Sequence, residues 1–284
     1  MFRKRQIISS FAAGSMLAMI AAPASAVLID DTDTAKAFFG GDKTSSPGTF
    51  VEVIGSTSKF QIYDMELTAV SASVAKVKIH TEFIGTWGNN ADTDYGDLLL
   101  HAHSGGSGWT PLGAPPNYKG DEFTPVGGPH ARGSALNEWN FAVRMSRAEA
   151  DDADAGTPDV LYTADLLKIA DADILTSNDE MAIVYPGGPP GFRDNQAVAV
   201  SDGDDTGKDV DVAIHYDADG TKAFIEFTIA HDGLLGDSWA ASWAMTCAND
   251  IVQGDLNVPE PATLALFSLS LLGAGMYRRR TRTA

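Results

Sequence analysis

The chain has 284 residues and is acidic, because 38 Asp and Glu residues outnumber 20 Lys and Arg residues and leave a net charge of −18. An acidic surface repels nucleic-acid phosphates and anionic lipid headgroups but attracts divalent cations and cationic partners, so we expect no nucleic-acid partner. Hydrophobic residues make up 44% of the sequence, and 28 Gly and 13 Pro interrupt it, which predicts a packed core with many turns rather than a disordered chain.

The N-terminus has the three parts of a secretory signal peptide. Basic residues come first, an apolar stretch runs over residues 7–20, and Ala24 and Ala26 supply the small side chains behind which a signal peptidase cuts. A membrane anchor is the alternative, but serines and a glycine interrupt the apolar stretch. We therefore expect entry into the secretion translocon and removal of residues 1–26, which leaves Val27 as the new N-terminus.

Alternation of apolar and polar residues predicts several antiparallel strands. In residues 76–83, Val77 and Ile79 share one face and charged residues occupy the other. Residues 210–216 and 223–229 alternate in the same way around an Asp-Gly turn, which is typical of a β-hairpin. Further strands are expected at 50–54, 60–70, 97–101, 139–143, 181–185, 196–200 and 239–247, and only 147–152 and 164–170 look helical.

These short strands and their Gly-, Pro- and Asp-rich links are typical of an all-β fold. We predict a single antiparallel β-sandwich, jelly-roll-like, over residues 27–257. In the late strand, Trp239 and Trp243 share one face and would supply much of the core. Cys247 lies on the same face and is the only cysteine, so it forms no intramolecular disulfide. It is interpreted as a small buried hydrophobic residue, with intermolecular pairing left open.

Acidic residues cluster in the expected loops, and the densest cluster spans residues 202–209. Oxygen-rich loops bind calcium, so Asp202, Asp204 and Asp209 are candidate calcium ligands. A true EF-hand is excluded, because Ala213 stands where its loop needs a bidentate Glu. Two interpretations stay open: a calcium site at the rim of the sandwich, or ordinary Asx turns that need no cofactor.

Candidates for catalysis or metal chemistry are few. His101 and His103 are two residues apart, hence on one face of a strand, and would need a third ligand to hold a transition metal. Residues 236–238, Gly-Asp-Ser, resemble the nucleophile block of one class of esterases, but here they open a late strand. A secreted hydrolase of matrix polysaccharide is the alternative to a binding protein, with Glu122 and Glu138 as its carboxylate pair.

The sequence contains no Gly-x-Ser-x-Gly elbow, no His-Glu-x-x-His and no phosphate-binding loop. We therefore predict a domain without catalytic activity. Four aromatic residues fall in expected loops, at Trp87, Trp109, Tyr118 and Phe192. They would either stack on sugar rings or pack at the rim of the sandwich.

The end of the chain has a distinctive order. A Pro-Glu-Pro tripeptide comes first, an apolar segment follows, and arginines close it: Pro259, Glu260, Pro261, residues 262–277, Arg278, Arg279 and Arg280. A helix over the apolar segment would span ~24 Å, slightly less than a ~30 Å hydrocarbon core. We expect a short transmembrane helix with the arginines in the cytoplasm. The prolines keep the chain extended around the glutamate, as a processing protease requires.

This order resembles the PEP-CTERM sorting signal of Gram-negative bacteria that produce exopolysaccharide. The resemblance covers residues 258–284 and implies that an exosortase, a membrane-embedded cysteine protease, recognises the Pro-Glu-Pro and cuts near it during export. It also implies that the arginines hold the tail in register, whereas the alternative is a plain single-pass anchor. Residues 95–99 and 243–251 resemble segments that recur inside members of this family, without an implied role.

The sequence thus predicts a signal peptide (1–26), an extracellular β domain (27–257) and a sorting tail (258–284). Without the two ends, 13 basic and 37 acidic residues remain, a net charge of −24. We expect an exported protein that passes through an inner-membrane intermediate to the cell surface or extracellular matrix. There it would adhere or bind polysaccharide without catalysis, or serve as a coat component with no ligand.

Overall fold

The computed structural model describes residues 25–31, 53, 56–85, 93–103, 139–145, 159–177, 179–180, 196–236 and 238–257. Within these ranges the elements follow one another as β1 (Ser25–Asp30), α1 (Thr57–Phe60), β2 (Ile62–Ser71), β3 (Val74–Thr81), β4 (Leu98–His103), β5 (Phe141–Val143), β6 (Asp159–Lys168), η2 (Asp171–Asp173), β7 (Ile174–Thr176), β8 (Ala197–Val200), β9 (Asp204–Tyr216), β10 (Ala223–Ala230), β11 (Ser238–Ala244) and β12 (Ile251–Asn257).

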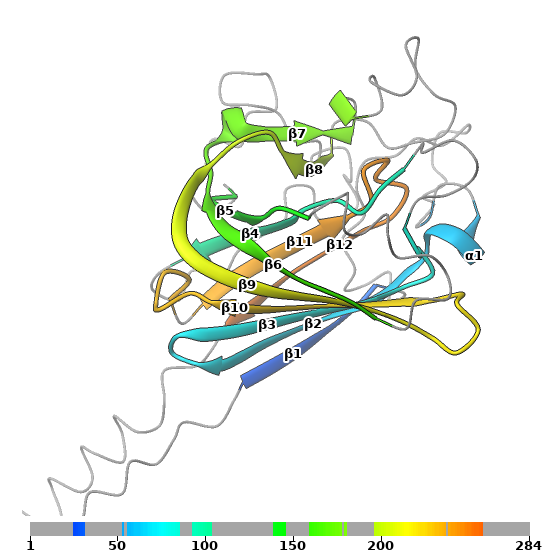
Figure 1. The fold of residues 1–284 in the computed structure, drawn as a ribbon, viewed down its shortest axis with the longest axis horizontal. Helices are drawn as coiled ribbons and strands as arrows, with labels where there is room; N and C mark the ends of the chain where they lie inside the picture. The colour runs from blue at the N-terminus through cyan, green and yellow to red at the C-terminus, as the bar shows by residue number, and fades with distance from the viewer. Residues whose placement is uncertain are drawn as a thin grey trace, which may run out of the picture.

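Ten of these strands form one antiparallel sheet, in the order β1-β2-β3-β10-β9-β6-β5-β4-β11-β12. The sheet curls until its last strand contacts its first two, so that it is nearly closed into a barrel (Figure 1). Two contacts mark this seam: the Ile62 backbone N–H donates to Asp250 Oδ2 at 2.6 Å, and Gly254 lies directly against the Ile29 side chain. The remaining strands, β7 and β8, pair with each other in a small separate sheet.

Period-two alternation explains the strands and fills the interior of the curled sheet. In β3, Val77 and Ile79 are fully buried, as the sequence predicted, and the intervening lysines point outward. The hairpin of β9 and β10 forms as predicted, and its turn is closed by a hydrogen bond from Gly220 N–H to Asp217 O at 2.9 Å. Trp239 and Trp243 share the interior face of β11, also as predicted.

A second apolar layer covers the outside of β4, β5 and β11. Side chains on the far face of these strands, such as Leu99 and Ala240, pack against Ile174 and Val200 of β7 and β8. Figure 1 shows these two short strands lying over β4 and β5, with the long β9 curving up beside them. This region is therefore buried on both faces, whereas the opposite half of the sheet has one face in solvent.

The all-β, antiparallel prediction is confirmed, but the jelly-roll sandwich is not. The large sheet is continuous and curls nearly into a barrel, and within the described ranges only the small β7-β8 sheet adds a second layer. The alternation of side chains is the same in a sandwich and in a closing sheet, so the pattern did not distinguish them. The helix expected at 164–170 is wrong, because these residues continue β6 to Lys168 and pair with β5 and β9.

Several expectations lie outside the described residues. These are the signal peptide apart from its last two residues, the helix at 147–152, the strand at 181–185 and the apolar tail segment at 262–277; of the strand at 50–54, only Val53 is described. In the part of the chain that the structure describes, no helix has the length and apolar character to cross a membrane.

Candidate functional site

The outward side chains of β2, β3, β10, β9 and β6 form a continuous surface, here called the outer face. It comprises Asp64, Glu66, Lys76, Lys78, His80, Leu161, Thr163, Asp211, Ala213, His215, Phe224, Glu226 and Thr228. The antiparallel register sets these residues in rows across the sheet, because directly opposite residues point the same way. The outer face therefore brings together residues that are more than 160 positions apart in sequence.

One row places an exposed aromatic ring between two imidazoles. Phe224 lies directly opposite His80 on one side and His215 on the other. The His80 and Phe224 rings meet edge to face, with centroids 4.8 Å apart, and His80 Nδ1 lies 2.8 Å from Asp64 Oδ1. Phe224 nevertheless keeps 39% of its surface exposed. An aromatic ring is therefore presented to solvent in the row of the outer face that lies nearest the β9-β10 turn.

The next row is a charge cluster centred on Glu226. Lys76 Nζ lies 2.5 Å from Glu226 Oε1, and Lys78 Nζ lies 3.4 Å from Glu226 Oε2. Partial burial opposes ionisation of this carboxyl, but the hydrogen bonds and charges of the two lysines outweigh it and lower its pKa. Glu66 lies opposite Lys78 on the same face, so two carboxylates balance the two lysines in this cluster.

Beside the cluster is a hollow of about 390 Å³. Its outward lining consists of Leu161, Thr163, Asp211, Ala213, Glu226 and Thr228. The small Ala213 lowers the floor between Glu226 and Leu161, and Leu161 is 72% exposed. The hollow thus combines an aliphatic wall with hydroxyl and carboxylate groups, which suits a ligand with both C–H and O–H surfaces.

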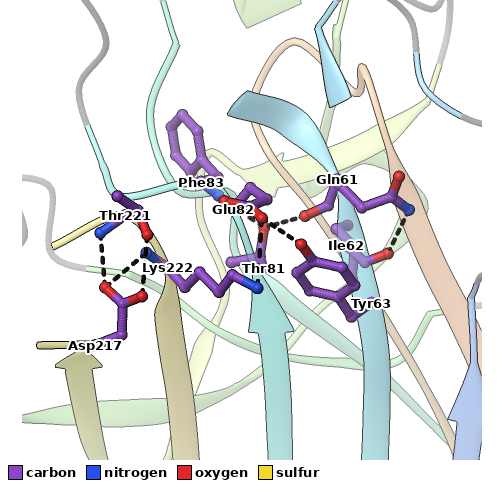
Figure 2. Close-up of polar contacts among 9 residues, drawn as sticks. All are labelled: Gln61, Ile62, Tyr63, Thr81, Glu82, Phe83, Asp217, Thr221 and Lys222. Atoms are coloured by element: carbon purple, nitrogen blue, oxygen red, sulfur yellow. Dashed lines mark hydrogen bonds and ion pairs between the residues drawn. The ribbon is translucent and has the colours of Figure 1, made fainter. Parts of the chain in front are cut away.

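At one end of the outer face, a polar cluster ties β2, β3 and β10 together (Figure 2). The Tyr63 hydroxyl donates a hydrogen bond to Glu82 Oε1. Lys222 Nζ lies 3.6 Å from the same oxygen and 4.7 Å above the centre of the Tyr63 ring. The bond to Glu82 raises the pKa of Tyr63, so this phenol stays protonated at neutral pH and does not act as a base.

The adjoining β9-β10 turn is held by a carboxylate. Asp217 Oδ1 accepts from the backbone N–H groups of Thr221, at 2.7 Å, and Lys222, at 3.2 Å. The Thr221 hydroxyl adds a bond to Asp217 Oδ2 at 3.0 Å. These bonds, led by the Thr221 backbone, lower the pKa of Asp217. The end cluster and the turn therefore fix one border of the outer face.

Two segments singled out in the sequence, 95–99 and 243–251, lie against each other. The Gly96 backbone N–H donates to Ala244 O at 3.1 Å, and the Trp243 indole N–H donates to Gly96 O at 3.0 Å. A Cβ at Gly96 would lie 2.2 Å from that Ala244 oxygen, which explains the glycine. Buried Asp97 extends the junction, because its two oxygens accept from Met145 N, at 2.7 Å, and Val200 N, at 2.8 Å. We interpret this junction as structural.

The structure brings together only part of the predicted calcium site. Asp202 and Asp204 line a hollow of about 230 Å³ that also contains Asp173 and Lys168. Asp209 lies farther along β9, opposite Asp165 of β6. Across the described ranges, no three His, Cys, Asp or Glu side chains gather closely enough to hold a metal ion. Calcium binding stays a prediction.

The other chemical candidates are not assembled into a site. His101 is buried in β4 and lies opposite Ala240, and the side chain of His103 is outside the described residues. Ser238 is buried and paired within the sheet rather than raised on a turn between a strand and a helix. Cys247 is buried in the core, as predicted.

The remaining predicted candidates lie outside the described residues. They are Ala24 of the signal cleavage pattern, the carboxylate pair Glu122 and Glu138, the loop aromatics Trp87, Trp109, Tyr118 and Phe192, and the tail residues Pro259, Glu260, Pro261, Arg278, Arg279 and Arg280. Ala26 is described and lies in β1, opposite Thr68 of β2.

Comparison with known protein families locates one match, to the PEP-CTERM protein-sorting motif at residues 257–280. The chain carries this motif. The match contains the Pro-Glu-Pro tripeptide, the apolar segment and the three arginines at 278–280. The PEP-CTERM motif marks an exported protein that passes the membrane and is processed by an exosortase. No curated protein and no solved structure matches the chain.

Sequence reasoning missed the outer face, although a signal was present. Residues 223–229 alternate, and Phe224 falls at an outward position where a polar residue is expected. A large apolar side chain on the solvent face of a strand is the kind of exception that marks a contact surface. His80 falls at an outward position by the alternation of residues 76–83, but its common row with His215 required the strand order.

Proposed function

We propose that this chain is an exported protein that an exosortase sorts to the cell surface or biofilm matrix, where its β domain binds polysaccharide without catalysis. The PEP-CTERM motif at residues 257–280 is the observation that carries the sorting half of the proposal. It implies a route through the secretion translocon to an intermediate held in the inner membrane by the segment 262–277. Processing near Pro259, Glu260 and Pro261 would then release the domain.

The outer face supports the binding half. Sugar rings have apolar C–H faces and hydroxyl edges, so they suit an exposed aromatic ring beside carboxylates, hydroxyls and amines. Phe224 supplies the ring, and the hollow next to Glu226 supplies hydrogen-bonding groups. A net charge of −24 on residues 27–257 disfavours acidic polymers. The proposed ligand is therefore a neutral polysaccharide.

The sorting half is tested in the native host with a Pro259→Ala, Glu260→Ala, Pro261→Ala variant. We expect wild-type protein to reach the surface or medium without its C-terminal arginines, and the variant to stay in the membrane at full length. Intact-mass measurement of both proteins defines their ends, including the expected N-terminus at Val27. Normal release of the variant would refute exosortase sorting.

The binding half is tested by affinity electrophoresis in gels that contain dextran, hydroxyethyl cellulose or alginate. We expect retardation by a neutral polymer but not by alginate, and Phe224→Ala should weaken it by ~10-fold, the factor that about 1.4 kcal/mol of lost ring contact represents. Leu234→Ala is the matched control, because Leu234 is another exposed apolar residue and lies outside the outer face. Equal retardation of the two variants, or none of the wild type, would refute the binding half.

A further inference from the structure

The sorting motif begins inside the folded sheet. Strand β12 runs to Asn257, which is paired with Ser238 of β11, and the PEP-CTERM match starts at that same residue. Only Val258 separates the last paired residue from Pro259. Any segment that a protease must hold on the N-terminal side of Pro259 therefore includes residues of β12.

β12 is held by backbone pairing on one side and by side-chain packing on the other. On one side it pairs with β11, and Leu256, opposite Trp239, is 2% exposed and belongs to the interior core. On the other side Gly254 packs against Ile29 of β1. The turn that leads into β12 is fixed as well, because Asp250 accepts the Ile62 N–H of β2 at 2.6 Å. β12 is thus the last hydrogen-bonded strand of the sheet, and its packing contacts with β1 and β2 form the seam.

A protease binds its substrate as an extended chain whose backbone groups pair with the enzyme. Backbone already paired in a sheet is not free for this, so folded proteins are cut through locally opened forms. The chain between the end of β12 and the apolar segment is also short. From Asn257 to the start of the apolar segment at residue 262 the chain reaches ~17 Å when fully extended, which keeps the domain close to the membrane.

We propose that the last residues of β12 must leave the sheet before the exosortase cuts the tail, so that the seam sets the rate of processing. This inference rests on the proposed sorting function. It makes β12 a latch: a folded precursor is processed as often as Leu256 and Asn257 detach from β11, and the cut domain closes again when they return.

The test is a pulse-chase of the full-length precursor in the native host. A six-residue Gly-Ser insertion between Val258 and Pro259 provides free chain beyond the latch, and we expect processing to accelerate by ~10-fold, the factor that about 1.4 kcal/mol of opening free energy represents. The matched control is the same insertion after Ala218, in the exposed β9-β10 turn, which should leave the rate unchanged.

The opposite change is a disulfide that holds β12 on β11, here called the lock. Ser238→Cys with Asn257→Cys joins directly opposite positions, a geometry that accommodates a disulfide, and we expect uncut precursor to accumulate until a reductant is added. Its control is Val74→Cys with Ala230→Cys, an opposite pair of β3 and β10 that lies outside the outer face and away from β12.

Failure of the latch proposal and failure of the sorting function give different results. Wild-type rates in both the insertion variant and the oxidised lock would overturn the latch while sorting stands. Normal release of the Pro259→Ala, Glu260→Ala, Pro261→Ala variant in the same strain would instead overturn the sorting function.

Discussion

Replacing Gly96 with alanine is expected to destabilise the domain severely. The added Cβ would lie 2.2 Å from Ala244 O and 2.5 Å from Val198 O. Both are backbone atoms, so neither can rotate away, and the strands themselves must separate. That movement weakens two hydrogen bonds, from Gly96 N to Ala244 O at 3.1 Å and from Asp97 N to Val198 O at 2.8 Å. At about 1 kcal/mol per bond plus ~1–3 kcal/mol of overpacking, the loss is ~3–5 kcal/mol.

The assay is urea unfolding of residues 27–257, followed by the fluorescence of the buried tryptophans. Gly254→Ala is the comparison, because its added Cβ would lie 2.1 Å from Cδ1 of Ile29, the flexible end of a side chain. We expect that variant to lose only ~1–2 kcal/mol and to recover part of it when Ile29→Ala is added. A Gly96→Ala loss below ~1 kcal/mol, or no larger than that of Gly254→Ala, would contradict the close packing at the junction.

Three further predictions concern single side chains. Burial lowers the pKa of His231, so the unfolded chain takes up a proton near pH 6.5 before the folded one does. Stability should therefore fall as the pH drops below about 6.5, less steeply in His231→Gln, as read from urea midpoints at each pH. Trp243→Phe leaves the Gly96 carbonyl without its indole donor and should cost ~2–3 kcal/mol in the same assay. Glu226→Gln should cost under ~1 kcal/mol, because its pair with Lys76 is partly exposed, and the difference should vanish in 1 M NaCl.

The sequence predicted those strands that have one face in solvent. β3, β9 and β10 follow strict alternation because their outer face is polar and their inner face is the core. The Asp-Gly turn between β9 and β10 was predictable for a local reason: Gly220 has a positive φ of 63°, which glycine adopts without strain. Local chemistry was sufficient wherever neighbouring residues in the sequence make the decisive contacts.

The helix prediction at 164–170, where β6 lies instead, was wrong for a physical reason. The alternation of β6 continues to the end of the strand, so Leu166 lies in the interior core while Leu167, on the opposite face, contacts the β7-β8 layer. Two adjacent buried leucines resemble a helix in sequence. Only the presence of apolar layers on both faces makes them a strand. The outer layer comes from residues 174–176 and 197–200, which no local pattern connects to β6.

In the acidic cluster at 202–209, one carboxylate makes the kind of local turn that the Asx interpretation describes. Asp205 Oδ1 accepts the Gly207 backbone N–H at 2.7 Å, and Gly207 has a positive φ of 67°. The carboxylate thus shapes an irregularity at the start of β9, as Asp does in turns, while Thr206 donates to Leu166 O of β6 at 2.6 Å. The oxygen-rich spacing that suggested calcium ligands therefore has a structural explanation in part.

The two ends of the domain meet at the seam, and this has a consequence for export. Cleavage after Ala26, as predicted, would remove two residues from β1 and leave Val27 to Asp30 paired with β2. β1 is the first strand and β12 the last in the chain, so the contact of Ile29 with Gly254 forms only after the entire domain has been translocated. Closure of the sheet therefore requires the complete domain, and it occurs at the strand that leads directly into the sorting motif. A precursor with an unfinished fold exposes its tail freely, whereas a closed one presents it only through opening of β12. The same seam that completes the core thus connects the folded state of the domain to its processing.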